Sequence, residues 1–158
     1  GQIPTNKSNV DSLLALTQWA WTFDPAVGMI NAIKASGYLN AVRNAELRNL
    51  IASFEDLSRD TREEDLIVQN IIIKKYVPLV SKYVSMVQRT KYLGDIYVAI
   101  DSTRTAPNYK GLFNDREFES LLAYLYTWRA DGKMEGENFL KLIVKFINNI
   151  EEELENRV

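Results

Sequence analysis

The chain contains neither histidine nor cysteine. Histidine is the usual acid–base group near neutral pH and the commonest metal ligand, and cysteine supplies thiol nucleophiles, disulfides and thiolate ligands. Their absence excludes Ser-His-Asp catalysis, ordinary zinc sites, di-iron Glu-x-x-His sites and disulfide-stapled folds. Chemistry based only on carboxylates, lysine or tyrosine is the alternative, but no such set stands out. We therefore predict that the chain is not an enzyme and that it needs no cofactor or metal.

Several other signals are missing. The chain has no apolar run long enough to cross a bilayer and no visible signal peptide. It has no glycine-rich phosphate loop and no basic block, and its net charge is −2. Nucleic acid is therefore a poor candidate partner.

The composition is that of an ordinary globular protein. The chain has 158 residues, of which 46% are hydrophobic and 25% charged. We predict a single helical domain over residues 1–158. Because the chain begins with Gly1 rather than Met, we expect Gly1 to be the remnant of a removed tag.

Two short helices are expected at the N-terminus. The first starts after Ser8 or Asn9 and ends near Thr22. The second starts at the Asp24-Pro25 pair, a capping carboxylate followed by a proline in the first turn. It ends at Gly37, which we expect in the left-handed conformation, with Tyr38 packing back on Ile33.

Two long helices follow. The first opens at Asn44, carries apolar residues at steps of three and four, and should be kinked or divided at Pro78. The last is capped by Asn114 or Asp115. We favour one helix through Gly132, although Asp-Gly is a turn signal and a break is the main alternative. Its predicted apolar seam consists of Phe118, Leu121, Leu125, Trp128, Phe139, Ile143, Phe146, Ile150 and Leu154, and its glutamate-rich end is expected to be solvated and frayed.

The connection between the long helices is the least regular part. Residues 96–100 have strand character, although a buried crossover or a short helix fits equally well, and residues 102–111 are expected to form a loop. The predicted fold class is therefore all-α, with little or no β structure. It is an antiparallel helical bundle of two long helices plus the short N-terminal helices.

One stretch of the chain resembles a known family. F-D-P from Phe23, the run SGYLNAVRNAELRNLIASFEDL from Ser36 and the acidic TREED from Thr61 resemble an uncharacterised bacterial family of single-pass membrane proteins with a helical extracytoplasmic domain. The F-N-D-R-E-F run from Phe113 resembles a second segment of that family. The resemblance implies a location on the periplasmic side, tethered by an upstream transmembrane helix that is not present here, and it implies no activity. The matching positions include Ser36, Gly37, Leu39, Asn44, Leu47, Arg48, Glu63, Glu64 and Asp65.

Three groups of side chains are candidates for a site, and each has a purely structural alternative. Acidic residues at 60 and 63–65 could share a divalent cation, but we favour a solvated helix face neutralised by Arg59 and Arg62. Aromatic residues could form a binding surface or a core, with Trp21 and Tyr126 expected to be the exposed pair. Arg48 could face a partner or pair with a nearby acid. Trp21, Tyr126 and Arg48 form the predicted interaction surface.

These features lead to two hypotheses of different classes. The first is a non-enzymatic extracytoplasmic interaction or sensor-like domain of a membrane-anchored bacterial protein, with a protein partner or self-association. The alternative is a helical bundle that binds a small molecule in an aromatic-lined pocket between helices. An exposed apolar stripe would favour association, and a closed apolar cavity would favour the alternative.

Overall fold

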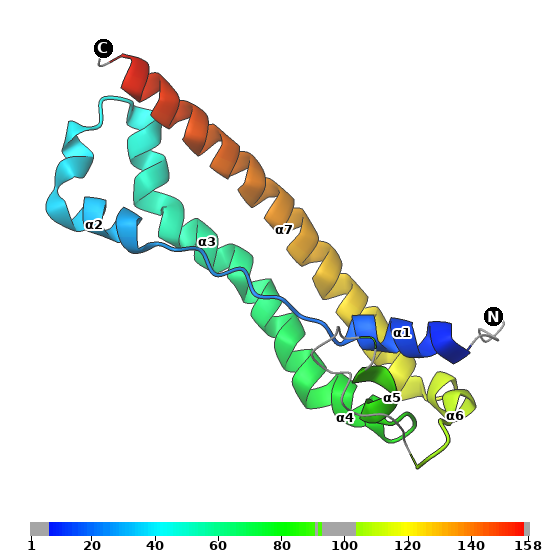
Figure 1. The fold of residues 1–158 in the computed structure, drawn as a ribbon. Coiled ribbons are helices and arrows are strands. Elements are labelled where there is room, and N and C mark those ends of the chain that lie inside the picture. Colours follow the sequence, from blue (N-terminus) through cyan, green and yellow to red (C-terminus); the bar gives the residue numbers. More distant parts are fainter. Residues whose placement is uncertain (1–6, 91, 93–103, 157–158) are drawn as a thin grey trace. The chain divides into compact units, whose positions relative to one another are not determined.

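The structure is a computed structural model, and it describes residues 7–90, 92 and 104–156 (Figure 1). These residues form helices, turns and irregular segments without a β strand, so the predicted all-α class is confirmed. The strand-like segment 96–100 lies outside the described residues. The elements are α1 (Lys7–Thr17), α2 (Gly28–Ser36), the 3₁₀ helix η1 (Tyr38–Ala41), α3 (Ala45–Ile71), the π helix η2 (Ile72–Tyr76), α4 (Val77–Ser81), α5 (Met86–Thr90), α6 (Tyr109–Phe113) and α7 (Arg116–Glu155).

The chain divides into two compact units, each with its own core. The first unit consists of Gly1–Trp21 and Ile67–Trp128, and the second of Thr22–Leu66 and Arg129–Val158. The long helices α3 and α7 therefore contribute residues to both units. The single domain over residues 1–158 stays a prediction.

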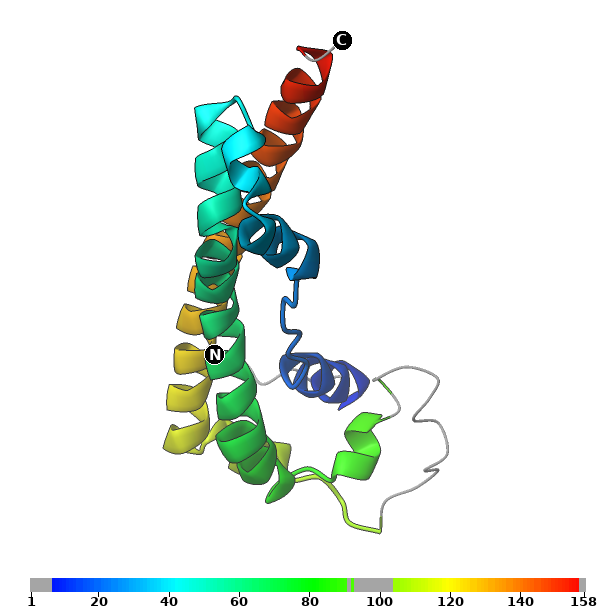
Figure 2. The ribbon, with the colours of Figure 1, turned by 90° about the vertical axis from the view of Figure 1, so that its left-hand side faces the viewer.

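The core of the first unit surrounds Tyr76, which is fully buried. Its hydroxyl donates a hydrogen bond of 3.0 Å to the backbone carbonyl of Leu14 in α1, and its ring lies 6.4 Å from that of Phe118 in α7. α1 also packs beside α5 (Figure 2). Other buried members of this core are Val10, Val68, Ile71, Ile72, Leu79, Val80, Val84, Leu112, Leu121 and Leu125.

In the second unit, α3 and α7 run antiparallel, as predicted. Glu46 near the start of α3 forms an ion pair with Lys145, whereas Phe54, two turns later, meets both Phe139 and Phe146. The centroids of these ring pairs are 5.7 and 5.8 Å apart. α2 and η1 pack on the first part of α3, where the buried cluster is Ile30, Leu47 and Ile51.

The boundaries of the N-terminal helices differ from the prediction. α1 ends at Thr17 rather than near Thr22, because the Thr17 hydroxyl and the next two backbone N–H groups bond back to the preceding turn. α2 begins at Gly28 rather than at the Asp24-Pro25 pair. Asp24 instead forms an ion pair of 3.1 Å with Arg62 of α3.

Gly37 ends α2 with a φ of 75°, which confirms the predicted left-handed cap. The expectation that Tyr38 packs on Ile33 is wrong, because 71% of Tyr38 is exposed. Leu39, one residue later, joins Ile33 around the second unit's cluster instead. The 3₁₀ turn that follows the cap turns the next residue inward.

Pro78 produces a π segment rather than a clean break. Proline has no N–H and its ring crowds the carbonyl four residues earlier, so the α-helical ladder cannot continue through it. The ladder widens before it, and the N–H of Val77 bonds to the carbonyl of Ile72, five residues back. The helical piece after Pro78 ends at Ser81, and α6, which was expected to be loop, is capped by Asn108.

α7 continues through Gly132 as a single helix of 40 residues, as favoured. Its predicted cap is also confirmed, because the Asp115 carboxylate accepts the N–H of Glu117 at 2.7 Å and that of Phe118 at 3.4 Å. The predicted seam is wrong at its end, where Ile150 and Leu154 are exposed.

Candidate functional site

The three residues of the predicted interaction surface lie in different units. Trp21 and Tyr126 belong to the first unit and are 74% and 77% exposed. Arg48 belongs to the second unit, so the three residues do not form one site within either unit. Their role in binding stays a prediction.

Arg48 turns towards its own backbone. Its Nη1 atom donates to the carbonyl oxygens of Val42 and Arg43, which precede α3. A guanidinium that holds two carbonyls fixes the turn into the helix. This arrangement favours a structural role for Arg48 over a partner-facing one.

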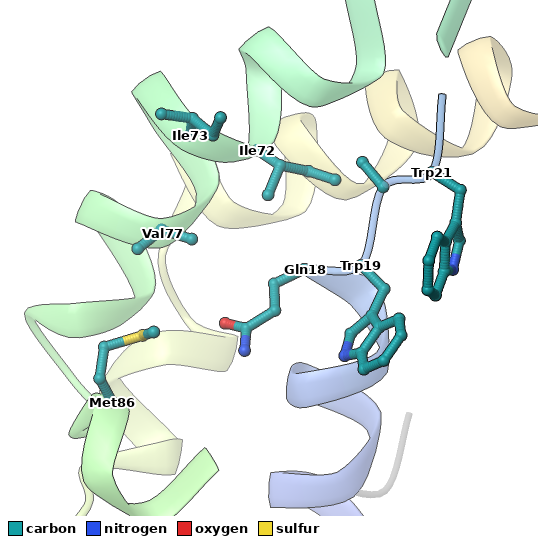
Figure 3. Close-up of a pocket in the computed structure, with 8 residues that line it drawn as sticks. Gln18, Trp19, Trp21, Ile72, Ile73, Val77 and Met86 are labelled. Atoms are coloured by element: carbon teal, nitrogen blue, oxygen red, sulfur yellow. The ribbon is translucent and has the colours of Figure 1, made fainter. Parts of the chain in front are cut away.

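The first unit contains an open pocket of about 400 Å³ next to Trp21 (Figure 3). Figure 3 shows the two indole rings on one side and the side chains of Val77 and Met86 on the other, with Gln18 reaching between them. The Trp19 and Trp21 rings lie 5.0 Å apart and are tilted by 51°. The pocket is lined by Gln18, Trp19, Ala20, Trp21, Ile72, Ile73, Val77 and Met86.

Two departures from α-helical geometry create this pocket. Because α1 ends at Thr17, residues 18–21 run as irregular chain and present both tryptophans to the same hollow. On the opposite wall, the π segment before Pro78 supplies Ile72 and Ile73. π segments are frequent at functional sites because the wider turn redirects side chains.

A buried arginine lies directly behind the pocket wall. Arg89 is 0% exposed, and its guanidinium donates to Gln18 Oε1 at 3.1 Å and contacts the sulfur of Met86 at 2.7 Å. Both partners line the pocket. Nη2 also donates to Ser81, whereas Nε is buried without a partner among the described residues. Burial lowers the pKa of Arg89, and the nearby Tyr76 and Asp11 oppose that shift.

Asp11 is the buried acid of this region. It is 2% exposed, and its carboxylate accepts a hydrogen bond of 2.6 Å from the hydroxyl of Tyr109. Burial is the first cause of the raised pKa of Tyr109, and the hydrogen bond to Asp11 is the second. Among the described residues, Asp11 is therefore hydrogen-bonded to Tyr109. Its interaction with Arg89 is a Coulombic attraction without a hydrogen bond.

Two members of the acidic cluster on α3, Glu64 and Asp65, interact with other parts of the second unit. Asp65 accepts the backbone N–H of Phe23 at 2.9 Å. Glu64 lies near Glu135 of α7, and repulsion from Glu64 is the largest cause of the raised pKa of Glu135. Within the described residues, no group of three or more acids is arranged to hold a metal ion.

The second unit presents an exposed apolar stripe along α7. Its five members are 37–61% exposed and follow one another at steps of four, three, three and four residues. Steps of three and four keep side chains on one face of a helix, and here two consecutive steps of three depart from the strict heptad of a coiled coil. The seam facing α3 is instead completed by polar residues, Asn149 and Glu153, which is why the predicted apolar seam failed there. The stripe consists of Leu140, Val144, Ile147, Ile150 and Leu154.

Comparison of the chain with protein-family profiles, curated proteins and solved structures finds no match. Among the described residues, none of the helices combines the length and apolar character needed to span a bilayer.

Proposed function

We propose that this chain is a non-enzymatic interaction domain that pairs with a second copy of itself through the apolar stripe of α7. The observation that carries the proposal is the stripe itself. Five exposed apolar side chains at steps of three and four on one helix face are costly in water, and burying them under a second helix is favourable. Contiguous exposed apolar surface of this kind is typical of interaction sites.

The charges beside the stripe favour a second copy as the occupant. The exposed Lys141 lies near the start of the stripe, and the exposed Glu152 and Glu155 lie near its end on the same flank. In an antiparallel pair centred near Ile147, the start of each stripe meets the end of the other. Lys141 of each copy then faces the acids of its partner, which selects the antiparallel orientation.

Sedimentation equilibrium of the whole chain tests the pairing. We expect a concentration-dependent dimer, and we expect Val144→Glu to abolish it, because the substitution places a charge within the stripe. Met29→Glu is the matched control, since Met29 is an exposed apolar residue of the same unit outside the stripe. A strictly monomeric wild-type chain at the highest attainable concentration would overturn the proposal.

A charge exchange tests the orientation. Lys141→Glu and Glu155→Lys should each weaken dimerisation, because each homodimer then holds two like-charge pairs. Mixing the two variants should restore dimers, since both interfacial pairs become oppositely charged in the mixed species. A mixture of the two variants that stays monomeric would contradict the antiparallel arrangement.

We further propose that the domain lies on the periplasmic side of a bacterial membrane, tethered by an upstream helix. The support is the resemblance carried by residues 36–65 and by the F-N-D-R-E-F run. Sequencing the gene upstream of the codon for Gln2 tests it. A hydrophobic span of about 20 residues is expected there, and its absence would refute the tether.

A further inference from the structure

The pocket between the tryptophans and the π segment has an apolar interior and a buried cation behind its wall. We infer that it binds a monocarboxylate with an apolar body, such as a medium-chain fatty acid. The apolar body lies among the tryptophan and isoleucine side chains, and the carboxylate bonds to the amide of Gln18. This inference is independent of the proposed function, because the pocket and the α7 stripe share no residue.

The apolar part of the ligand follows from the lining. Of the eight described residues that line the pocket, seven are apolar or aromatic, and two of these, Trp21 and Ile73, are largely exposed. A volume of about 400 Å³ lies within the range of small-molecule sites. A bound apolar chain would cover both exposed side chains and remove their surface from water.

The acidic part follows from Gln18. Its Oε1 atom accepts a hydrogen bond from Arg89, and this fixes the orientation of the amide and leaves its NH₂ group as the donor. A donor of this kind in an apolar pocket binds an acceptor. The charge of Arg89 makes an anionic acceptor the preferred one, because attraction across a poorly hydrated wall is only weakly screened.

The local charge balance supports an anion rather than a neutral acceptor. Among the described residues, the guanidinium of Arg89 is hydrogen-bonded to an amide, a hydroxyl and a thioether, all of them neutral groups. Asp11, the acid whose field it feels, is bonded to Tyr109 instead. Buried charges are stabilised by pairing, and a carboxylate in the pocket would bring a second negative charge towards Arg89.

Isothermal titration calorimetry with decanoate and decanol tests the inference on the whole chain. The two probes share an apolar chain and differ in the carboxylate. We expect decanoate to bind roughly tenfold or more tightly than decanol, the scale of a hydrogen bond to a charged group. Equal affinities, or no binding of decanoate, would overturn the inference.

Variants separate the two halves of the site. Trp21→Ala should weaken both probes, whereas Arg89→Met should weaken decanoate alone and bring it to the level of decanol. Tyr126→Ala is the matched control, because it removes an equally exposed aromatic ring of the same unit outside the pocket. An Arg89→Met protein that melts cooperatively yet keeps the preference for decanoate would refute the role of the cation.

If Arg89→Met does not fold, Gln18→Leu serves in its place. An unchanged preference for decanoate in Gln18→Leu would contradict the inference equally.

Discussion

The carboxylate of Glu153, near the end of α7, accepts the backbone N–H of Asn44 at 2.9 Å, although the two residues are 109 positions apart. The other carboxylate oxygen accepts the N–H of Arg43 at 3.1 Å. Glu153 therefore satisfies backbone donors at the start of α3, where the helix dipole favours a negative charge. An acid that is unfavourable at the end of its own helix becomes favourable because it lies at the beginning of its neighbour.

Glu153→Gln should lower the free energy of unfolding by about 1.5–3 kcal/mol, the range for hydrogen bonds to charged groups. An amide has a single oxygen, so it can accept only one of the two bonds well. Urea unfolding followed by circular dichroism measures the loss. Glu63→Gln is the control, since Glu63 is exposed on α3 and lies outside the α7 stripe, and such substitutions change stability by about 0.5 kcal/mol or less. Equal effects of the two substitutions would show that Glu153 is no cap.

Alanine substitutions at Gly37, which ends α2, and at Gly136, which lies within α7, should change the stability of the chain in opposite directions. Gly37→Ala should cost about 1 kcal/mol or more, because φ is 75° there and a Cβ atom resists that conformation. Gly136→Ala should instead stabilise by about 0.5–1 kcal/mol, since it is helical and a Cβ atom there meets nothing within 4 Å. Thermal melting compares them, and stabilisation by Gly37→Ala would contradict the cap.

Several helix features were predictable from local rules, but the local start signal at Asp24-Pro25 failed, because α2 begins at Gly28. The apolar periodicity correctly predicted that α7 continues through Gly132, because a helix tolerates an isolated glycine at a small cost in free energy. The cap at Asp115 and the stop at Gly37 depend on the residue itself and its nearest neighbours. The effect of Pro78 was predicted only in part. Sequence shows that the helical ladder is interrupted there, but not that a π turn absorbs the interruption.

The candidate sites were less predictable because they depend on contacts between distant residues. Gln18 and Arg89 are 71 positions apart, and nothing in their local sequences indicates that they meet. The stripe on α7 could have been found, since Leu140, Val144 and Ile147 repeat at coiled-coil steps beside the seam through Phe139. α3 covers only one of these two apolar stripes, and the other is the surface on which the proposed pairing depends.

The hydroxyl of Tyr109 should contribute more to the free energy of unfolding than the hydroxyl of Tyr83, although each donates a hydrogen bond to an aspartate. Tyr109→Phe leaves the buried carboxylate of Asp11 without this donor and should cost about 1–3 kcal/mol. Tyr83→Phe should cost less, because Asp115 still accepts the N–H of Glu117. Parallel urea titrations of the two variants decide the order, and a larger loss for Tyr83→Phe would show that burial of Asp11 is not the determining factor.

Glu135→Gln should raise the melting temperature at pH 7 by about 1–2 °C, the change expected for a few tenths of a kcal/mol in a chain of this length. Repulsion from Glu64, with burial and the charges of Asp60 and Asp131, raises the pKa of Glu135 above its ordinary value of 4.5. Because the folded-state pKa is the higher one, the folded chain binds the proton more tightly. The resulting stabilisation is fully present below pH 4.5 and is lost as the pH rises through the folded pKa.

A glutamine at this position carries no charge at any pH, so the gain over the wild type should be seen at pH 7 and should disappear below pH 4.5. Calorimetric melting across this interval measures the difference. Glu137→Gln is the control on the same helix, since Glu137 is exposed and forms an ion pair of 3.8 Å with Lys133. Its removal should leave the melting temperature at pH 7 unchanged or slightly lower. If the higher melting temperature of Glu135→Gln persists below pH 4.5, the amide must improve packing. Repulsion between the carboxylates of α3 and α7 would then not be the cause of the lower stability at neutral pH.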